Sequence, residues 1–155
     1  MRVQRKRGRL FVAFAPPERE LLENLTTELV DLLRGRDLTG TGTRDPAVER
    51  LLPDAYRDDI EASREYRSLT ESDLVDMKVE NAMMLARAAG GERAVEVDDD
   101  EFVSWLRAIT DLRLALATRL GIEKDDDEGD PRPEAAATRA AYWWLGALQE
   151  RLIAA

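Results

Sequence analysis

The stretch WLRAITDLRLALATRLGI, residues 105–122, decides the fold because it places charged side chains inside an otherwise apolar helical pattern. Its apolar residues recur every three or four positions, which is typical of a well-packed helix. Asp111, Arg113 and Arg119 lie in or beside that apolar stripe. Burying a charge without a hydrogen-bonded partner of opposite sign is strongly unfavourable. We therefore expect these three side chains to find partners within the fold.

Carboxylates elsewhere in the chain are the expected partners of Arg113 and Arg119. The candidates are Asp54, Asp58, Asp59, Glu65 and Asp73. We predict a polar network that fixes how the helices dock. The alternative is a carboxylate-dependent enzyme centred on an aspartate of this set, but the sequence reveals neither the separation of two carboxylates nor a substrate cleft. The predicted network consists of Asp54, Asp58, Asp59, Asp111, Arg113 and Arg119.

The whole pattern predicts a mainly α-helical, single-domain bundle with a small N-terminal β-hairpin. A chain of 155 residues suits one domain with one core. Strand-forming residues on both sides of Gly8 predict a hairpin over about residues 2–14, and residues 94–97 have the pattern of a third short strand able to join it. Helices are expected at about 17–34, 46–52, 59–66, 71–88, 99–120 and 133–153, with an acidic linker at 123–132.

Local signals mark several helix ends. Asp98 with Glu101 predicts a capping box, and Gly121 fits a left-handed C-terminal cap. The pair Thr70 and Asp73 resembles a second capping box, with aspartate in place of the usual glutamate or glutamine. These signals predict where two of the long helices begin.

The chain contains neither cysteine nor histidine. Disulfides, thiolate metal sites, cysteine nucleophiles and Ser-His-Asp triads are therefore excluded. The acidic linker lacks the twelve-residue pattern of an EF-hand, so we expect no metal and no cofactor. No apolar run approaches the roughly 20 residues that span a bilayer, and no signal-type apolar segment follows the N-terminus. We expect a cytoplasmic, non-enzymatic protein without membrane contact.

Positive charge is concentrated at the N-terminus. The net charge is −9, yet the first nine residues carry +5, which leaves −14 for the remainder. Such a basic segment can meet phosphate, an acidic partner or the acidic surface of this same chain. Nucleic-acid binding is a possible role but not the favoured one. The candidate contacts are Arg2, Arg5, Lys6, Arg7 and Arg9.

The last predicted helix carries two adjacent tryptophans that point about 100° apart, so a single groove cannot accept both. Either one of them reaches a protein partner or a second copy of the chain, or both cover different neighbours inside the molecule. The candidate partner surface is Trp143, Trp144 and Leu148. Methionines, including Met77 and Met83, offer an adaptable partner groove, although core filling is their commoner role.

Several segments resemble an actinobacterial family known as a domain of unknown function, which includes AosR-like oxidative-stress regulators. The resemblance covers almost the whole chain, and the family has no established enzymatic motif. The matching segments are RLLPDAYRDD (50–59), EYRSLT (65–70) with Lys78, WLRA (105–108), DLRLAL (111–116), TRLG (118–121) and YWWLGALQE (142–150).

This resemblance implies a regulatory protein that contacts a sigma factor or RNA polymerase and so influences stress-response transcription. The chain departs from the family in one respect, because a thiol-based redox sensor needs a cysteine and this chain has none. Methionine oxidation is the chemistry that remains available to it. Direct DNA binding through the basic N-terminal hairpin is the alternative regulatory mechanism.

Overall fold

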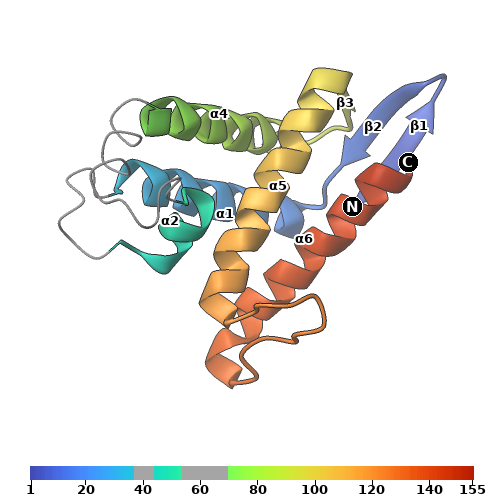
Figure 1. Cartoon of the computed structure of the whole chain (residues 1–155). Helices are drawn as coiled ribbons and strands as arrows, with labels where there is room; N and C mark the ends of the chain where they lie inside the picture. Colours follow the sequence, from blue (N-terminus) through green and yellow to red (C-terminus); the bar gives the residue numbers. More distant parts are fainter. Residues whose placement is uncertain (37–43, 54–69) are drawn as a thin grey trace.

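The computed structural model describes residues 1–36, 44–53 and 70–155, which form a mainly helical fold with a small antiparallel sheet (Figure 1). The predicted fold class is confirmed, whereas the helix predicted over 59–66 lies outside the described residues. The strands are β1 (Arg2–Lys6), β2 (Arg9–Ala13) and β3 (Val95–Val97). The helices are α1 (Pro16–Arg34), α2 (Pro46–Leu51), α4 (Ser72–Ala89), α5 (Asp99–Leu120) and α6 (Ala136–Ala154), with a 3₁₀ turn at Pro133–Ala135.

The sheet forms around the predicted two-residue turn. Arg7 and Gly8 both have positive φ, 51° and 80°, and a turn of this kind matches the twist of the two strands that it joins. β3 pairs antiparallel with β2, with Leu10 opposite Val97, so the strand order is β1-β2-β3. The third strand is therefore confirmed as part of the sheet, and Leu10, Val12 and Val97 on these strands are buried in the core.

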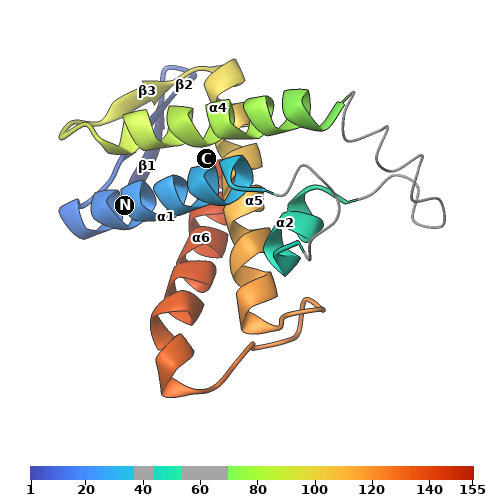
Figure 2. The same cartoon turned by 90° about the vertical axis from the view of Figure 1, so that its left-hand side faces the viewer.

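The helices surround α5. α1 and α4 run side by side, while α5 crosses them and α6 returns alongside α5 (Figure 2). α5 contacts α1, α2, α4 and α6, and its Trp105 is buried against Phe14, with 6.1 Å between the ring centroids. A helix with several neighbours must present apolar residues on more than one side. No helix within residues 1–36, 44–53 and 70–155 is long and apolar enough to cross a membrane.

One predicted capping box is present and the other is not. At the start of α5, the Asp98 carboxylate accepts from the Glu101 amide at 2.8 Å, and the Glu101 carboxylate accepts from the Asp98 amide at 3.1 Å. Gly121 ends this helix in the left-handed conformation, as expected. α4 begins after Glu71 without a side-chain cap, so the Thr70 and Asp73 prediction is wrong. The Glu71 side chain instead binds arginines.

The segment predicted as a linker connects α5 to α6, and it makes more local contacts than its composition suggests. The Asp127 carboxylate accepts from the backbone amides of Glu123 and Lys124, and the Asp130 amide donates to the Leu120 carbonyl at 2.9 Å. Gly129 has a φ of 83° and lies so close to Leu120 that a Cβ atom there would be 3.1 Å from the Leu120 side chain. The segment thus folds back on the end of α5.

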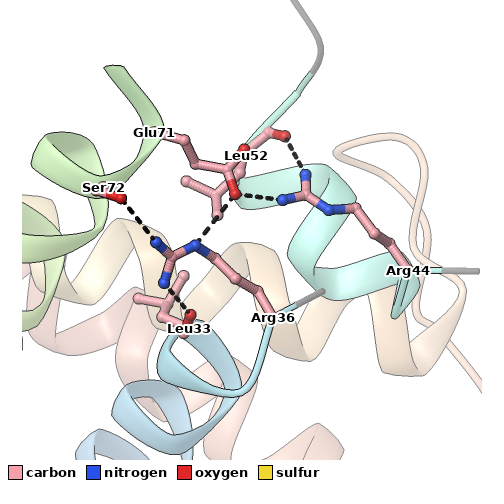
Figure 3. A network of polar contacts seen from close by, with 6 residues as sticks. All are labelled: Leu33, Arg36, Arg44, Leu52, Glu71 and Ser72. Carbon is pink, nitrogen blue, oxygen red and sulfur yellow. Dashed lines mark hydrogen bonds and ion pairs between the residues drawn. The ribbon is translucent and has the colours of Figure 1, made fainter. Parts of the chain in front are cut away.

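Glu71 joins α1, α2 and α4 through two arginines, an arrangement that we call the Glu71 clasp and define as Arg36, Arg44 and Glu71 (Figure 3). Both guanidinium groups bind the same carboxylate oxygen, with Arg36 Nε at 3.1 Å. All three side chains are buried. The remaining bonds in Figure 3 run from Arg36 to the Leu33 carbonyl (3.0 Å) and the Ser72 hydroxyl (3.4 Å), and from Arg44 to the Leu52 carbonyl (3.3 Å).

Asp45 connects α2 to α5. Its Oδ1 atom caps α2 by accepting from the Ala47 amide at 2.8 Å. The same carboxylate accepts two hydrogen bonds from the Arg119 guanidinium, at 2.9 and 2.8 Å. The hydrogen bonds from Arg119 are the main reason why the pKa of Asp45 is lowered. A short helix that would be marginal alone is thereby held against its neighbour.

Replacing Glu71 by glutamine should lower the free energy of unfolding by about 3 kcal/mol, because two buried guanidinium groups would lose their shared counter-charge. Urea denaturation at neutral pH measures the loss. The matched control is Glu96→Gln, which breaks the exposed Arg9–Glu96 pair and should cost about 0.5 kcal/mol or less. Equal losses in the two variants would contradict a structural role for the clasp.

Replacing Asp45 by asparagine keeps a capping side chain and removes the carboxylate charge. Because the folded-state pKa of Asp45 is depressed, its contribution to stability is present above about pH 4 and is lost as the pH falls through the folded-state pKa. At pH 7 the free energy of unfolding of the wild type should exceed that of the variant by about 1 kcal/mol or less, because the Asp45–Arg119 pair is partly exposed. Urea denaturation across pH should show this difference shrinking towards zero in acid, and a constant difference would contradict the charge effect.

Candidate functional site

Three charged residues of α5, namely Asp111, Arg113 and Arg119, attach it to three different helices. Asp111 Oδ1 accepts from Lys78 Nζ of α4 at 2.8 Å, and Arg119 binds Asp45 beside α2. Arg113 instead reaches α6. The expectation that each has a partner within the fold is correct, but the three do not share one network.

Arg113 differs most from expectation, because its partners in the described structure are neutral. Its guanidinium donates to Gln149 Oε1 at 3.0 Å and to the Tyr142 hydroxyl at 3.4 Å, and it lies 5.0 Å from the centroid of the Tyr142 ring. A cation over an aromatic face is stabilised without a carboxylate. The guanidinium also lies against Gly146, where a Cβ atom would be 3.4 Å from its nearest nitrogen. The signal in the sequence was a glycine between Tyr142 and Gln149 on one helical face.

The carboxylates expected to close the network do not do so in the described structure. Asp73 is exposed at the start of α4 and is not in an ion pair with any described residue. Sequence reasoning also missed Lys78 and Asp45 as the partners of Asp111 and Arg119. The other predicted members, Asp54, Asp58, Asp59 and the candidate Glu65, lie outside the described residues.

A groove of about 480 Å³ runs between α4 and α5, over the Asp111–Lys78 pair. Met77 and Val103 lie on its two sides, and each is 44% exposed, which is unusual for large apolar side chains. The α4–α5 groove is lined by Met77, Lys78, Asn81, Val103, Leu106, Arg107, Thr110 and Asp111.

Two buried polar atoms of residues that line this groove, Asp111 Oδ2 and Asn81 Nδ2, have no hydrogen-bond partner among the described residues. Their residues are only 5% and 6% exposed. Burial raises the pKa of Asp111, and Lys78 opposes that shift through a hydrogen bond and its charge. An acceptor and a donor left unpaired in a buried place are costly and call for an explanation. Both atoms are shielded from solvent and belong to residues that line the groove.

Acidic side chains lie on α4 outside the groove lining, whose charged residues are Lys78, Arg107 and Asp111. Asp73, Asp76 and Glu80 are exposed, and their spacing places them on the same side of α4 as Met77. None of the three is in an ion pair within the part of the chain that the structure describes. Exposed carboxylates near the groove attract basic groups of a ligand. Among the described residues no group of three acidic side chains is placed to hold a metal ion.

The tryptophan surface is only partly as predicted. Trp143 is exposed and meets Tyr142 edge-on, with 5.2 Å between the ring centroids. Trp144 is partly buried and donates from Nε1 to Glu18 at 3.1 Å, which ties α6 to α1. Leu148 is fully buried in the core, so its assignment to a surface is wrong. Of the three predicted residues, Trp143 is the one that α6 exposes to solvent.

The basic hairpin is exposed, but some of its charge is already engaged. Arg9 lies 3.3 Å from Glu96 across the sheet, and Arg5 donates to the carbonyl oxygens of Gly8 and Ala155. The five predicted contacts lie on β1, β2 and the turn between them. Four cations of the hairpin are exposed and have no ion pair with another described residue, namely Arg2, Arg5, Lys6 and Arg7.

Several known proteins that are similar to this chain are named oxidative stress regulators. The family model described as "Domain of unknown function (DUF2017)" matches residues 1–155. The oxidative stress regulator AosR of Mycobacterium tuberculosis H37Rv, like that of Mycobacterium bovis, is 32% identical over 98% of this chain and 84% of its own. A putative oxidative stress regulator AosR of Mycobacterium leprae is 30% identical over 91% of this chain and 79% of its own. No solved structure matches the chain. The chain is similar to these mycobacterial oxidative stress regulators and belongs to the DUF2017 family.

Proposed function

We propose that this protein is a non-enzymatic regulator that binds a basic amphipathic helix of a partner protein in the α4–α5 groove. The observation that carries the proposal is the pair of unpartnered atoms, Asp111 Oδ2 and Asn81 Nδ2, in a groove with half-exposed Met77 and Val103. An amphipathic helix meets both needs, because it brings an apolar stripe and polar side chains at fixed spacing.

The charge around the groove specifies the partner further. The exposed carboxylates Asp73, Asp76 and Glu80 lie on α4 outside the groove lining, so lysine or arginine at the edge of the partner helix that faces them would be attracted. A glutamine or asparagine within that stripe offers a donor for Asp111 and an acceptor for Asn81. A methionine in the wall adapts to the shape of a bound side chain.

A binding role suits the groove better than catalysis. Its described lining contains one carboxylate, Asp111, which is held by Lys78. Paired-carboxylate hydrolysis needs two carboxyl groups flanking a bond.

The transcription machinery is the proposed source of the partner helix. Relatives over nearly the whole chain are named oxidative stress regulators, which supports a regulatory role. We propose that the protein acts in the cytoplasm by contacting a sigma factor or RNA polymerase. Contact through Trp143 to a second copy and DNA binding through the hairpin are competing outcomes of the test below.

Purified protein should bind RNA polymerase core or one sigma factor of an actinobacterium, tested one component at a time by biolayer interferometry. Val103→Lys should weaken that binding by about tenfold, because a new cation in the groove repels a basic helix and removes apolar contact. Val103 is half exposed, so the variant should keep its fold, which circular dichroism checks.

The matched control is Ile153→Lys, which adds the same charge at an exposed apolar position of α6. Binding equally weakened in both variants, or unaffected by Val103→Lys, would reject the groove. No binding to any of these components would reject the transcription partner. Binding to duplex DNA that is lost when Arg2, Lys6 and Arg7 are changed to glutamate would support the hairpin instead.

A further inference from the structure

We infer that Met77 is a site of reversible oxidation by peroxide, and that its sulfoxide alters the α4–α5 groove. This inference rests on the proposed function for its biological role. The first observation is the exposure of the Met77 side chain. Met77 is 44% exposed, and thioether oxidation requires that an oxidant reach the sulfur. The chain has no cysteine to react first.

The position of Met77 makes its oxidation consequential. Met77 and Val103 form the apolar sides of the groove, and a partner's apolar stripe would contact both. Sulfoxide formation converts a flexible apolar side chain into a polar one. A polar oxygen within an apolar contact must be desolvated, which weakens binding.

The neighbouring Asn81 offers the new oxygen a partner inside the protein. Asn81 lies four residues after Met77 on α4, so the two side chains are on the same helical face. Asn81 Nδ2 is a buried donor without an acceptor. A sulfoxide oxygen on Met77 supplies an acceptor, and the hydrogen bond between them would hold the oxidised side chain over the groove.

The chemical step uses hydrogen peroxide as the oxidant. A lone pair of the Met77 sulfur attacks one peroxide oxygen, an S–O bond forms, and the O–O bond breaks. The second peroxide oxygen departs as hydroxide. It takes the proton of the hydroxyl group now bound to sulfur, which gives water and the sulfoxide. Sulfur is oxidised by two electrons and peroxide is reduced by two. Methionine sulfoxide reductases, with a thiol reductant, reverse the change.

Met83 provides a matched control on the same helix. It is 43% exposed, nearly the same as Met77, but it lines a different surface groove, between α4 and α1. Oxidation at Met83 should therefore leave the α4–α5 groove unchanged. The variants Met77→Leu and Met83→Leu each remove one of the two sulfurs and keep an apolar side chain of similar size.

The first experiment needs no partner. The full-length protein is treated with hydrogen peroxide, the sulfoxides are located by peptide mass spectrometry, and the Asn81 side-chain amide is followed by ¹H–¹⁵N NMR. Wild type and Met83→Leu should form the sulfoxide at Met77 and shift the Asn81 amide signal, whereas Met77→Leu should not shift it. An unoxidised Met77, or an Asn81 signal that does not move once Met77 is oxidised, would overturn the inference.

The second experiment measures binding of the polymerase component found above, before and after peroxide, for each protein. Peroxide should weaken binding about tenfold in wild type and Met83→Leu, but not in Met77→Leu. An equal loss in all three proteins would overturn the inference while leaving the groove intact. If no component binds, the proposed function fails, and the Asn81 signal still decides whether Met77 is the oxidation site.

Discussion

The structure depends on α5, which packs apolar side chains against several helices and must still be held in one orientation about its axis. Apolar packing alone fixes rotation weakly, because many side-chain arrangements fill the same space. Asp111, Arg113 and Arg119 remove that freedom, since each must meet a particular polar group on a different helix. A small rotation of α5 would break all three contacts together. These charges therefore contribute specificity of docking more than net stability.

Secondary structure was predictable where local chemistry decides it. The hairpin turn, the capping box at Asp98 and the glycine end of α5 each depend on a few adjacent residues, and all three appear as expected. The start of α4 did not follow its local signal. Glu71, beside the expected cap, is instead used by Arg36 and Arg44, which approach from parts of the chain about 30 residues away. A tertiary ion pair there overrides a local capping preference.

The candidate site was harder to predict for the same reason. Sequence analysis identified Asp111 as a buried charge that needs a partner, because an aspartate within an apolar helix is visible in one dimension. It named Met77 as a candidate for a partner groove but did not identify Asn81 or place the groove between α4 and α5, because these depend on how the two helices lie against each other. Arg113 shows the limit most clearly: a cation was expected to need an anion, yet an aromatic ring and an amide from α6 serve instead.

The buried carboxylates Glu71 and Asp111 differ in their surroundings, and this difference distinguishes a structural role from a candidate binding role. The Glu71 carboxylate is shared by two guanidinium groups, and such an arrangement holds helices together but offers little to a ligand. Asp111 is bound on one oxygen only, and its other oxygen lies in a groove whose apolar walls are half exposed. Replacing this aspartate together with Lys78 would cost little if the pair served packing alone, because an apolar pair of similar volume packs as well. The carboxylate bound on one oxygen, beside half-exposed apolar side chains, is therefore the feature on which the proposed partner site rests.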